Sequence, residues 1–188
     1  MKKFVFISSF LVAMLFAAVS CGKDNTPAQG NSPAITIPIQ LKVLALANQT
    51  KAPTPTVTVN LSDVLTPSGN QANAKYVSAV SITDMGSIAF KGISGSGITL
   101  SNIVFATSDN KFNAPLLDPL SKPLVISSDT TLTDLKTINN TILTNIANYL
   151  VSNKKIDLSA TFDTKGTADA QVSGTITLTI KGAIFTWN

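Results

Sequence analysis

Residues 35–43, with the sequence ITIPIQLKV, decide the fold class of this chain. Every second residue is a large aliphatic one, and the residues between them are polar, charged or proline. Alternation with a period of two places the aliphatic side chains on one face of a β-strand and the others on the opposite face. Because Pro38 cannot donate a hydrogen bond to a neighbouring strand, we expect this strand at the edge of a sheet or at a bulge.

Seven further stretches have the composition of strands, with turn-forming residues between them. Such a series predicts a mainly β protein, an antiparallel β-sandwich of about seven or eight strands. In the last stretch, we expect Gly182 to host a bulge that turns Phe185 and Trp187 inward. We interpret Trp187 as a side chain that covers the core rather than one on which a sugar ring stacks. The predicted strands after the first are residues 56–61, 76–82, 88–90, 98–106, 124–127, 155–162 and 171–187.

One segment has the period of a helix. Apolar residues recur at every third or fourth position, which predicts one helix over about 130–152, before a C-terminal hairpin. Ser128 or Asp129 is expected to cap its start, and Lys154 and Lys155 follow its end. Because of this helix, an α+β fold is the alternative to the β-sandwich. The residues of its apolar face are Leu132, Leu135, Ile138, Ile142, Ile146 and Tyr149.

The first twenty residues have the layout of a secretory signal peptide. Lys2 and Lys3 are followed by sixteen uncharged residues, 4–19, and the segment ends in small residues. As a helix, this apolar run would reach about 24 Å, which is shorter than the roughly 30 Å hydrocarbon layer of a membrane. We therefore predict a cleaved signal peptide rather than a membrane-spanning helix.

The residues Ala18-Val19-Ser20-Cys21 resemble the lipobox of bacterial lipoproteins, with alanine at the position where leucine is usual. This resemblance implies a diacylglycerol on Cys21, cleavage before it and a lipid-anchored protein of the bacterial outer membrane. Gly22, in place of aspartate, favours the outer over the inner membrane. The orientation at the surface or in the periplasm stays open, and so does ordinary cleavage at Ala18-x-Ser20, which would leave a soluble protein.

The domain organisation expected from these observations has three parts. Residues 1–20 are the signal peptide, and residues 21–34, rich in glycine and proline, are a lipidated flexible tether. Residues 35–188 form a single β-sandwich-like domain, which is long enough to bury its own core.

The composition excludes many kinds of chemistry. The chain has 14 lysines and 10 aspartates, a single cysteine at Cys21, and no glutamate, arginine or histidine. Without histidine and a second cysteine, the usual zinc sites and most acid–base schemes are absent. The lysines are scattered rather than gathered in a patch, which gives no nucleic-acid footprint. We therefore predict no enzyme, no catalytic or metal-binding residue, and no cofactor.

Three local motifs have a simpler interpretation than the function they resemble. Ser108-Asp109-Asn110 and Ser152-x-x-Lys155 are similar to two signatures of penicillin-recognising serine enzymes, but their order is reversed and the third signature is missing. We interpret them as coincidence. Asp129-Thr130-Thr131 resembles an O-glycosylation site of some bacteria, and we interpret it as a helix cap.

Two functional hypotheses follow. The first is a non-enzymatic, membrane-anchored lipoprotein that acts as a binding or structural module at the bacterial cell envelope, with a protein or glycan partner. The alternative is a carrier of small apolar ligands, with the helix of residues 130–152 covering a cavity in the sheet.

Overall fold

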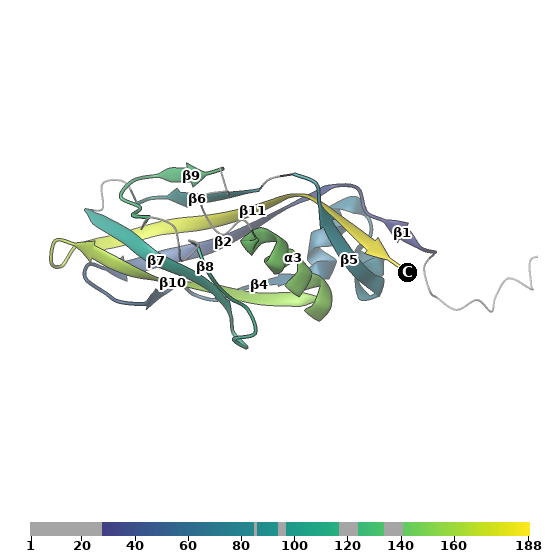
Figure 1. Cartoon of the computed structure of the whole chain (residues 1–188), viewed down its shortest axis with the longest axis horizontal. Coiled ribbons are helices and arrows are strands. Elements are labelled where there is room, and N and C mark those ends of the chain that lie inside the picture. The colour runs from purple at the N-terminus through teal and green to yellow at the C-terminus, as the bar shows by residue number, and fades with distance from the viewer. Residues whose placement is uncertain (1–27, 85, 94–96, 117–123, 134–140) are drawn as a thin grey trace, which may run out of the picture.

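The computed structural model describes residues 28–84, 86–93, 97–116, 124–133 and 141–188. These residues form two antiparallel sheets packed face to face, together with a few short helices (Figure 1). The predicted mainly β antiparallel sandwich is confirmed. Among the described residues, no helix has the length and apolar character needed to cross a membrane.

The first sheet, called sheet A here, is built around its longest strand, β11. Strands β1 and β2 pair with one side of β11, strands β5 and β6 pair with the other side, and β9 pairs with β6. The strands of sheet A are β1 (Gly30–Asn31), β2 (Ile35–Leu46), β5 (Val77–Ile82), β6 (Ser87–Lys91), β9 (Thr130–Leu132) and β11 (Gln171–Trp187).

The second sheet, sheet B, is built around β10. Strand β7 pairs with one side of β10 and carries β8 beyond it, while β3 and β4 pair with the other side. The strands of sheet B are β3 (Ala52–Pro53), β4 (Val57–Asn60), β7 (Ile98–Thr107), β8 (Asn113–Pro115) and β10 (Lys155–Gly166). The helical elements are α2 (Leu61–Leu65), the 3-10 turns η1 (Thr66–Ser68) and η2 (Gln71–Tyr76), and α3 (Ile142–Asn153).

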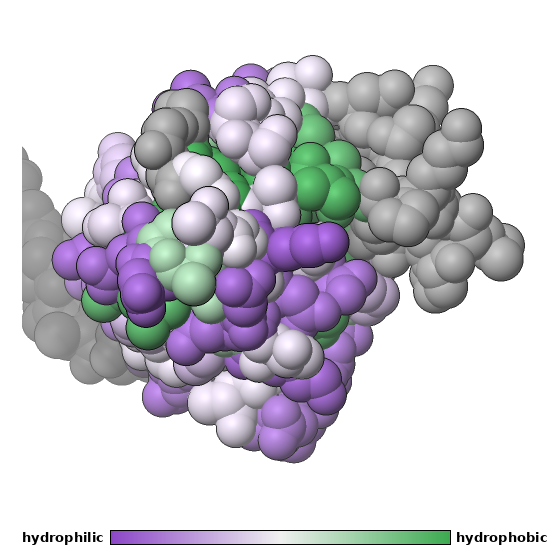
Figure 2. Space-filling view, turned by 90° about the vertical axis from the view of Figure 1, so that its left-hand side faces the viewer, coloured by the Kyte–Doolittle hydropathy of each residue, from purple (hydrophilic) through white to green (hydrophobic). Residues whose placement is uncertain are grey.

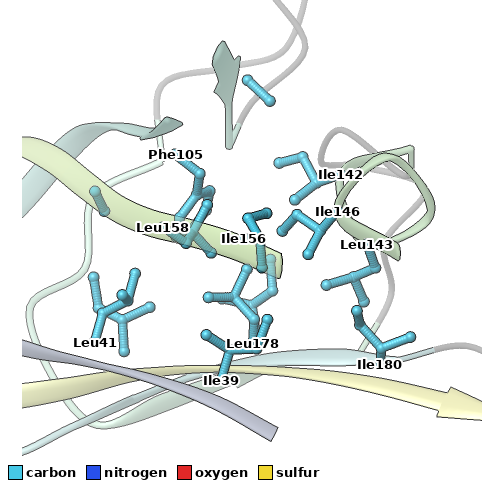
Figure 3. Packing of buried hydrophobic residues seen from close by; sticks show 14 of the residues in the cluster. Ile39, Leu41, Phe105, Ile142, Leu143, Ile146, Ile156, Leu158, Leu178 and Ile180 are labelled. Carbon is cyan, nitrogen blue, oxygen red and sulfur yellow. The ribbon is translucent and has the colours of Figure 1, made fainter. Parts of the chain in front are cut away.

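The core lies between the sheets and is almost wholly aliphatic and aromatic. The alternation predicted for residues 35–43 is confirmed, because every odd-numbered residue from Ile37 to Ala45 is buried and every even-numbered one is exposed. Figure 3 shows Ile39 and Leu41 of β2 beside Leu178 of β11, with Leu158 and Phe105 of sheet B above them. Burial of so many apolar side chains is the main source of the domain's stability.

Helix α3 is shorter than predicted. The prediction of a helix over 130–152 is wrong in its first part, where Thr130–Leu132 form β9 and Leu132 lies opposite Ile88 of β6. Leu132 fits a period of two as well as a period of 3.6, and the local pattern does not reveal a partner strand about forty residues earlier. Leu135 and Ile138 of the predicted helix face lie outside the described residues.

The remaining part of the helix packs as expected. Its buried side chains face β5, β10 and β11, and Figure 3 shows Ile142 and Ile146 pointing toward Ile156. Leu143 lies beside Ile180 of β11 in the same view. In the part of the chain that the structure describes, these side chains pack directly against the strands, where the carrier hypothesis placed a ligand cavity. The buried residues of α3 are Ile142, Leu143, Ile146, Ala147, Leu150 and Val151.

Two predictions about strand geometry are confirmed. The pairing of β11 with β2 shifts register between Ile180 and Ala183, and Gly182 between them has a positive φ of 63°. This bulge lets Ala183, Phe185 and Trp187 face the core. Pro38 lies in β2, which pairs on one side only among the described residues.

Other strand predictions need correction. Leu61 begins α2 rather than ending the strand predicted over 56–61. The strand predicted over 124–127 is reduced to one bridge between Ile126 and Leu100. Residues 30–32, expected in the flexible tether, pair with β11. The Trp187 side chain fixes these residues, because it donates a hydrogen bond to the Ala28 carbonyl (3.1 Å) and packs closely against Gly30.

Two buried hydroxyl groups, each on the residue before a proline, replace backbone hydrogen-bond acceptors at points where an edge strand is interrupted. The Ser32 side chain accepts a hydrogen bond from the Phe185 amide (3.0 Å), between β1 and β2. The Thr54 side chain accepts one from the Ala160 amide (2.9 Å), between β3 and β4. Each hydroxyl thereby satisfies a buried backbone donor that would otherwise lose its partner.

Candidate functional site

The motifs singled out in the sequence do not assemble a reactive centre. The Ser152 hydroxyl donates to the Asn148 carbonyl of its own helix (3.0 Å), and the Lys155 ammonium pairs with Asp157 (3.0 Å). The serine and the lysine therefore each bond to another residue, which agrees with the interpretation of this motif as a coincidence. Cys21, predicted to carry a lipid, lies outside the described residues.

Asp129 does not cap a helix. Its carboxylate accepts a hydrogen bond from the Ile93 amide (3.0 Å), and Thr130 donates from its hydroxyl to the Ser128 carbonyl (3.0 Å). These contacts precede β9 instead of α3, so the predicted cap is wrong for the same reason as the predicted helix start.

The densest group of polar contacts lies around Asp109, in the turn between β7 and β8. Its carboxylate accepts hydrogen bonds from the hydroxyls of Thr107 and Tyr149, both at 2.6 Å, and from the Lys111 amide at 3.1 Å. These donors, led by Thr107 and Tyr149, hold the pKa of Asp109 well below its usual range. The same contact with Asp109 raises the pKa of Tyr149.

Two further aspartates on β10 are stabilised in the same way. A hydrogen bond from Thr58 (2.6 Å) lowers the pKa of Asp157, and one from Asn102 (2.6 Å) lowers that of Asp163. A general acid needs a raised pKa, and a general base needs one near the working pH. Carboxylates that are held ionised by structural donors on both oxygens fit neither role, and we assign these aspartates to stability.

The surface feature that stands out is the outer edge of β2. This strand has twelve residues and pairs only with β11 among the described residues. The next longest strand that lies open on one side, β5, has six residues. A long open edge carries a row of unpaired backbone donors and acceptors, which is a template for adding another strand.

The hydrogen bonds at the C-terminal end of β2 show which residues face this edge. The Ala47 amide donates to the Ala170 carbonyl (2.9 Å), so the odd-numbered residues direct their backbone groups to β11. The even-numbered residues then direct theirs outward. Pro38, which has no amide hydrogen, occupies one of these outward positions, as edge strands require.

The series of free outward backbone groups ends before Leu46, because both backbone groups of Leu46 are already hydrogen-bonded within the chain. Its amide donates to the Gln49 side chain (3.0 Å), and its carbonyl accepts a hydrogen bond from the Thr164 hydroxyl (2.7 Å). The open part of the edge therefore comprises five outward positions, namely Thr36, Pro38, Gln40, Lys42 and Leu44.

Apolar side chains are exposed beside this edge. Leu44 is 61% exposed and Leu46 is 49% exposed, and both lie next to the turn between β10 and β11 through pairing with Ser173 and Gln171. Figure 2 views this end of the molecule and shows hydrophobic areas within a mainly hydrophilic surface. The sequence already contained this signal, because leucine replaces the polar residue of the alternation after Val43.

Comparisons with known proteins found similarity only at the level of structure. No family model matches the chain, and no curated protein matches it. The decameric capsid protein of the circovirus BFDV shares 13% identity over 84% of this chain and 99% of that chain, with a TM-score of 0.36. A structure of infectious bursal disease virus, Gt strain, shares 12% identity over 90% of this chain and 42% of that chain, with a TM-score of 0.21.

The comparisons found two viral structures and no bacterial lipoprotein, so the interpretation as a bacterial outer-membrane lipoprotein is not retained. The predictions that depended on it are not retained either. They are the role at the cell envelope, the alternative apolar-ligand carrier, the membrane and glycan partners, and the outer-membrane localisation. The resemblance rested on residues 18–21, which carry no information about the domain that follows. At these TM-scores, neither viral structure transfers a function to this chain.

Proposed function

We propose that this chain is a non-enzymatic structural protein that assembles with other protein chains by strand addition to β2 of sheet A. The observation that carries the proposal is the open edge of β2, with outward positions from Thr36 to Leu44. An added strand would satisfy the outward backbone groups and cover part of the exposed Leu44 side chain.

The rest of the described surface supports a structural role. The polar groups around Asp109, Asp157 and Asp163 are used to fix turns and strands to one another. No group of three or more potential metal ligands occurs among the residues that the structure describes. Assembly through backbone hydrogen bonds needs neither a cofactor nor a reactive side chain.

Hydrogen exchange of the full chain tests this function. At concentrations where the chain is monomeric, the amides of Gln40, Lys42 and Leu44 should exchange fast, while those of Leu41 and Val43, bonded to β11, should exchange slowly. A synthetic peptide of residues 35–46, offered as a generic strand, should slow the outward amides. If no added strand changes their exchange, the proposed function is wrong.

A pair of variants separates the contribution of the Gln40 backbone amide to peptide binding from that of its side chain. Gln40→Pro removes one outward amide and leaves the bonds to β11 in place, so it should weaken peptide capture. Gln40→Ala removes the same side chain but keeps the amide, and should retain capture. Equal peptide binding by the two variants would contradict strand addition at this position.

A further inference from the structure

We infer that the strand added to β2 is β2 of a second copy of this chain, in antiparallel pairing about a two-fold axis at Gln40. This inference rests on the proposed function and names its partner and register. Residue i of one copy would then lie opposite the residue of the second copy at an equal distance on the other side of Gln40.

The first argument is that the open edge is self-complementary. The outward positions run from Thr36 to Leu44 in steps of two, so Gln40 is their midpoint. An axis at Gln40 pairs all five positions of one copy with all five of the other. It also leaves out Leu46, whose outward groups are already bonded within the chain.

Symmetric registers with the axis at a neighbouring outward position are disfavoured by particular residues, and no axis other than Gln40 pairs all five outward positions. An axis at Lys42 would place two ammonium groups directly opposite each other, which is destabilising. An axis at Pro38 would oppose two residues that lack an amide hydrogen and would leave Lys42 and Leu44 unpaired. An axis at Leu44 would require the backbone groups of Leu46, which Gln49 and Thr164 occupy.

The side chains are compatible with the axis at Gln40. Gln40 would face Gln40 of the second copy, where two side-chain amides can bond to each other. Lys42 would face Pro38 of the second copy, and the two Lys42 positions would lie about 13 Å apart along the strands. This separation exceeds the Debye length of about 8 Å at physiological salt, so repulsion between them is screened.

Sedimentation and cysteine cross-linking of the full chain test this pairing, in a Cys21→Ser background that removes the native thiol. The chain should form a concentration-dependent dimer. Gln40→Cys should cross-link across the axis under mild oxidation, because paired strands bring the two Cα atoms to about 5.5 Å. The matched variant Lys42→Cys should not, because its two positions are beyond disulfide reach.

A third variant tests the register from the opposite direction. Pro38→Val restores an outward amide that would bond to the Lys42 carbonyl of the second copy, so it should tighten the dimer about tenfold. A dimer that cross-links through Lys42→Cys and not through Gln40→Cys would overturn this register.

A chain that stays monomeric at all concentrations would overturn self-pairing. Protection of the outward amides by the 35–46 peptide would then still support strand addition by another protein. Absence of both dimer and peptide protection would remove the proposed function as well.

Discussion

At the scale of single residues, Asp109 connects the β7–β8 turn to α3 through Tyr149. Folding lowers the pKa of this carboxyl, so the folded state favours its ionised form. The contribution to stability is complete above the unfolded pKa of about 4, and it is lost as the pH falls through the folded value.

Replacement of Tyr149 by phenylalanine removes one of the strongest donors to that carboxylate. The Tyr149→Phe variant should melt at a lower temperature than the wild type at pH 7, and the gap should narrow as the pH falls below about 4. Thermal unfolding at several pH values measures this gap. A gap that is the same at pH 7 and pH 2 would show that the Tyr149 hydroxyl does not act through the ionised carboxylate of Asp109.

Thr54 has a structural role that its sequence context does not reveal. Its amide donates to the Ala160 carbonyl (2.8 Å), and its hydroxyl accepts from the Ala160 amide in place of a backbone carbonyl. The residue is only 5% exposed. Thr54→Val keeps the shape but leaves the Ala160 amide without an acceptor, which should lower the free energy of unfolding by about 1–3 kcal/mol. Thr56→Val, at an exposed position nearby, should change it by less than about 0.5 kcal/mol in chemical denaturation.

At the scale of elements, local patterns predicted most strands and missed what depends on distant partners. The alternation in residues 35–43 and the glycine in β11 were sufficient to predict an edge strand and a bulge. The start of α3 was not predictable in this way, because Leu132 serves a helix and a strand equally well. Pairing of β9 with β6 decided between them, and that pairing is not encoded locally.

The buried face of α3 yields a sharp test of packing. Ile146 is fully buried, and Ile146→Asp places a charge among the side chains of sheets A and B. It should destabilise the domain by several kcal/mol and prevent cooperative folding. Thr144→Asp, on the exposed side of the same helix, should unfold within about 0.5 kcal/mol of the wild type. Similar melting of both variants by circular dichroism would contradict this packing.

At the scale of the whole molecule, the candidate site depends on topology. Pro38 indicated an edge strand from the sequence, but the length of the open edge follows only from the pairing of β2 with β11. Those strands are separated by more than a hundred residues, and no periodic pattern relates them. The lipobox-like residues 18–21 were recognisable at once, yet they described a different part of the chain and led to the wrong function.

The net charge of the chain provides a test of how whole copies meet. Each copy carries a formal charge of +4, and the strands of sheet A contain the lysines Lys42, Lys91 and Lys181 but no aspartate. Two such copies repel each other at long range, while the backbone hydrogen bonds between paired β2 strands depend little on salt. Raising the salt concentration should therefore tighten the dimer in sedimentation equilibrium. If salt instead dissociates it, oppositely charged surfaces rather than the β2 edges must hold the copies together.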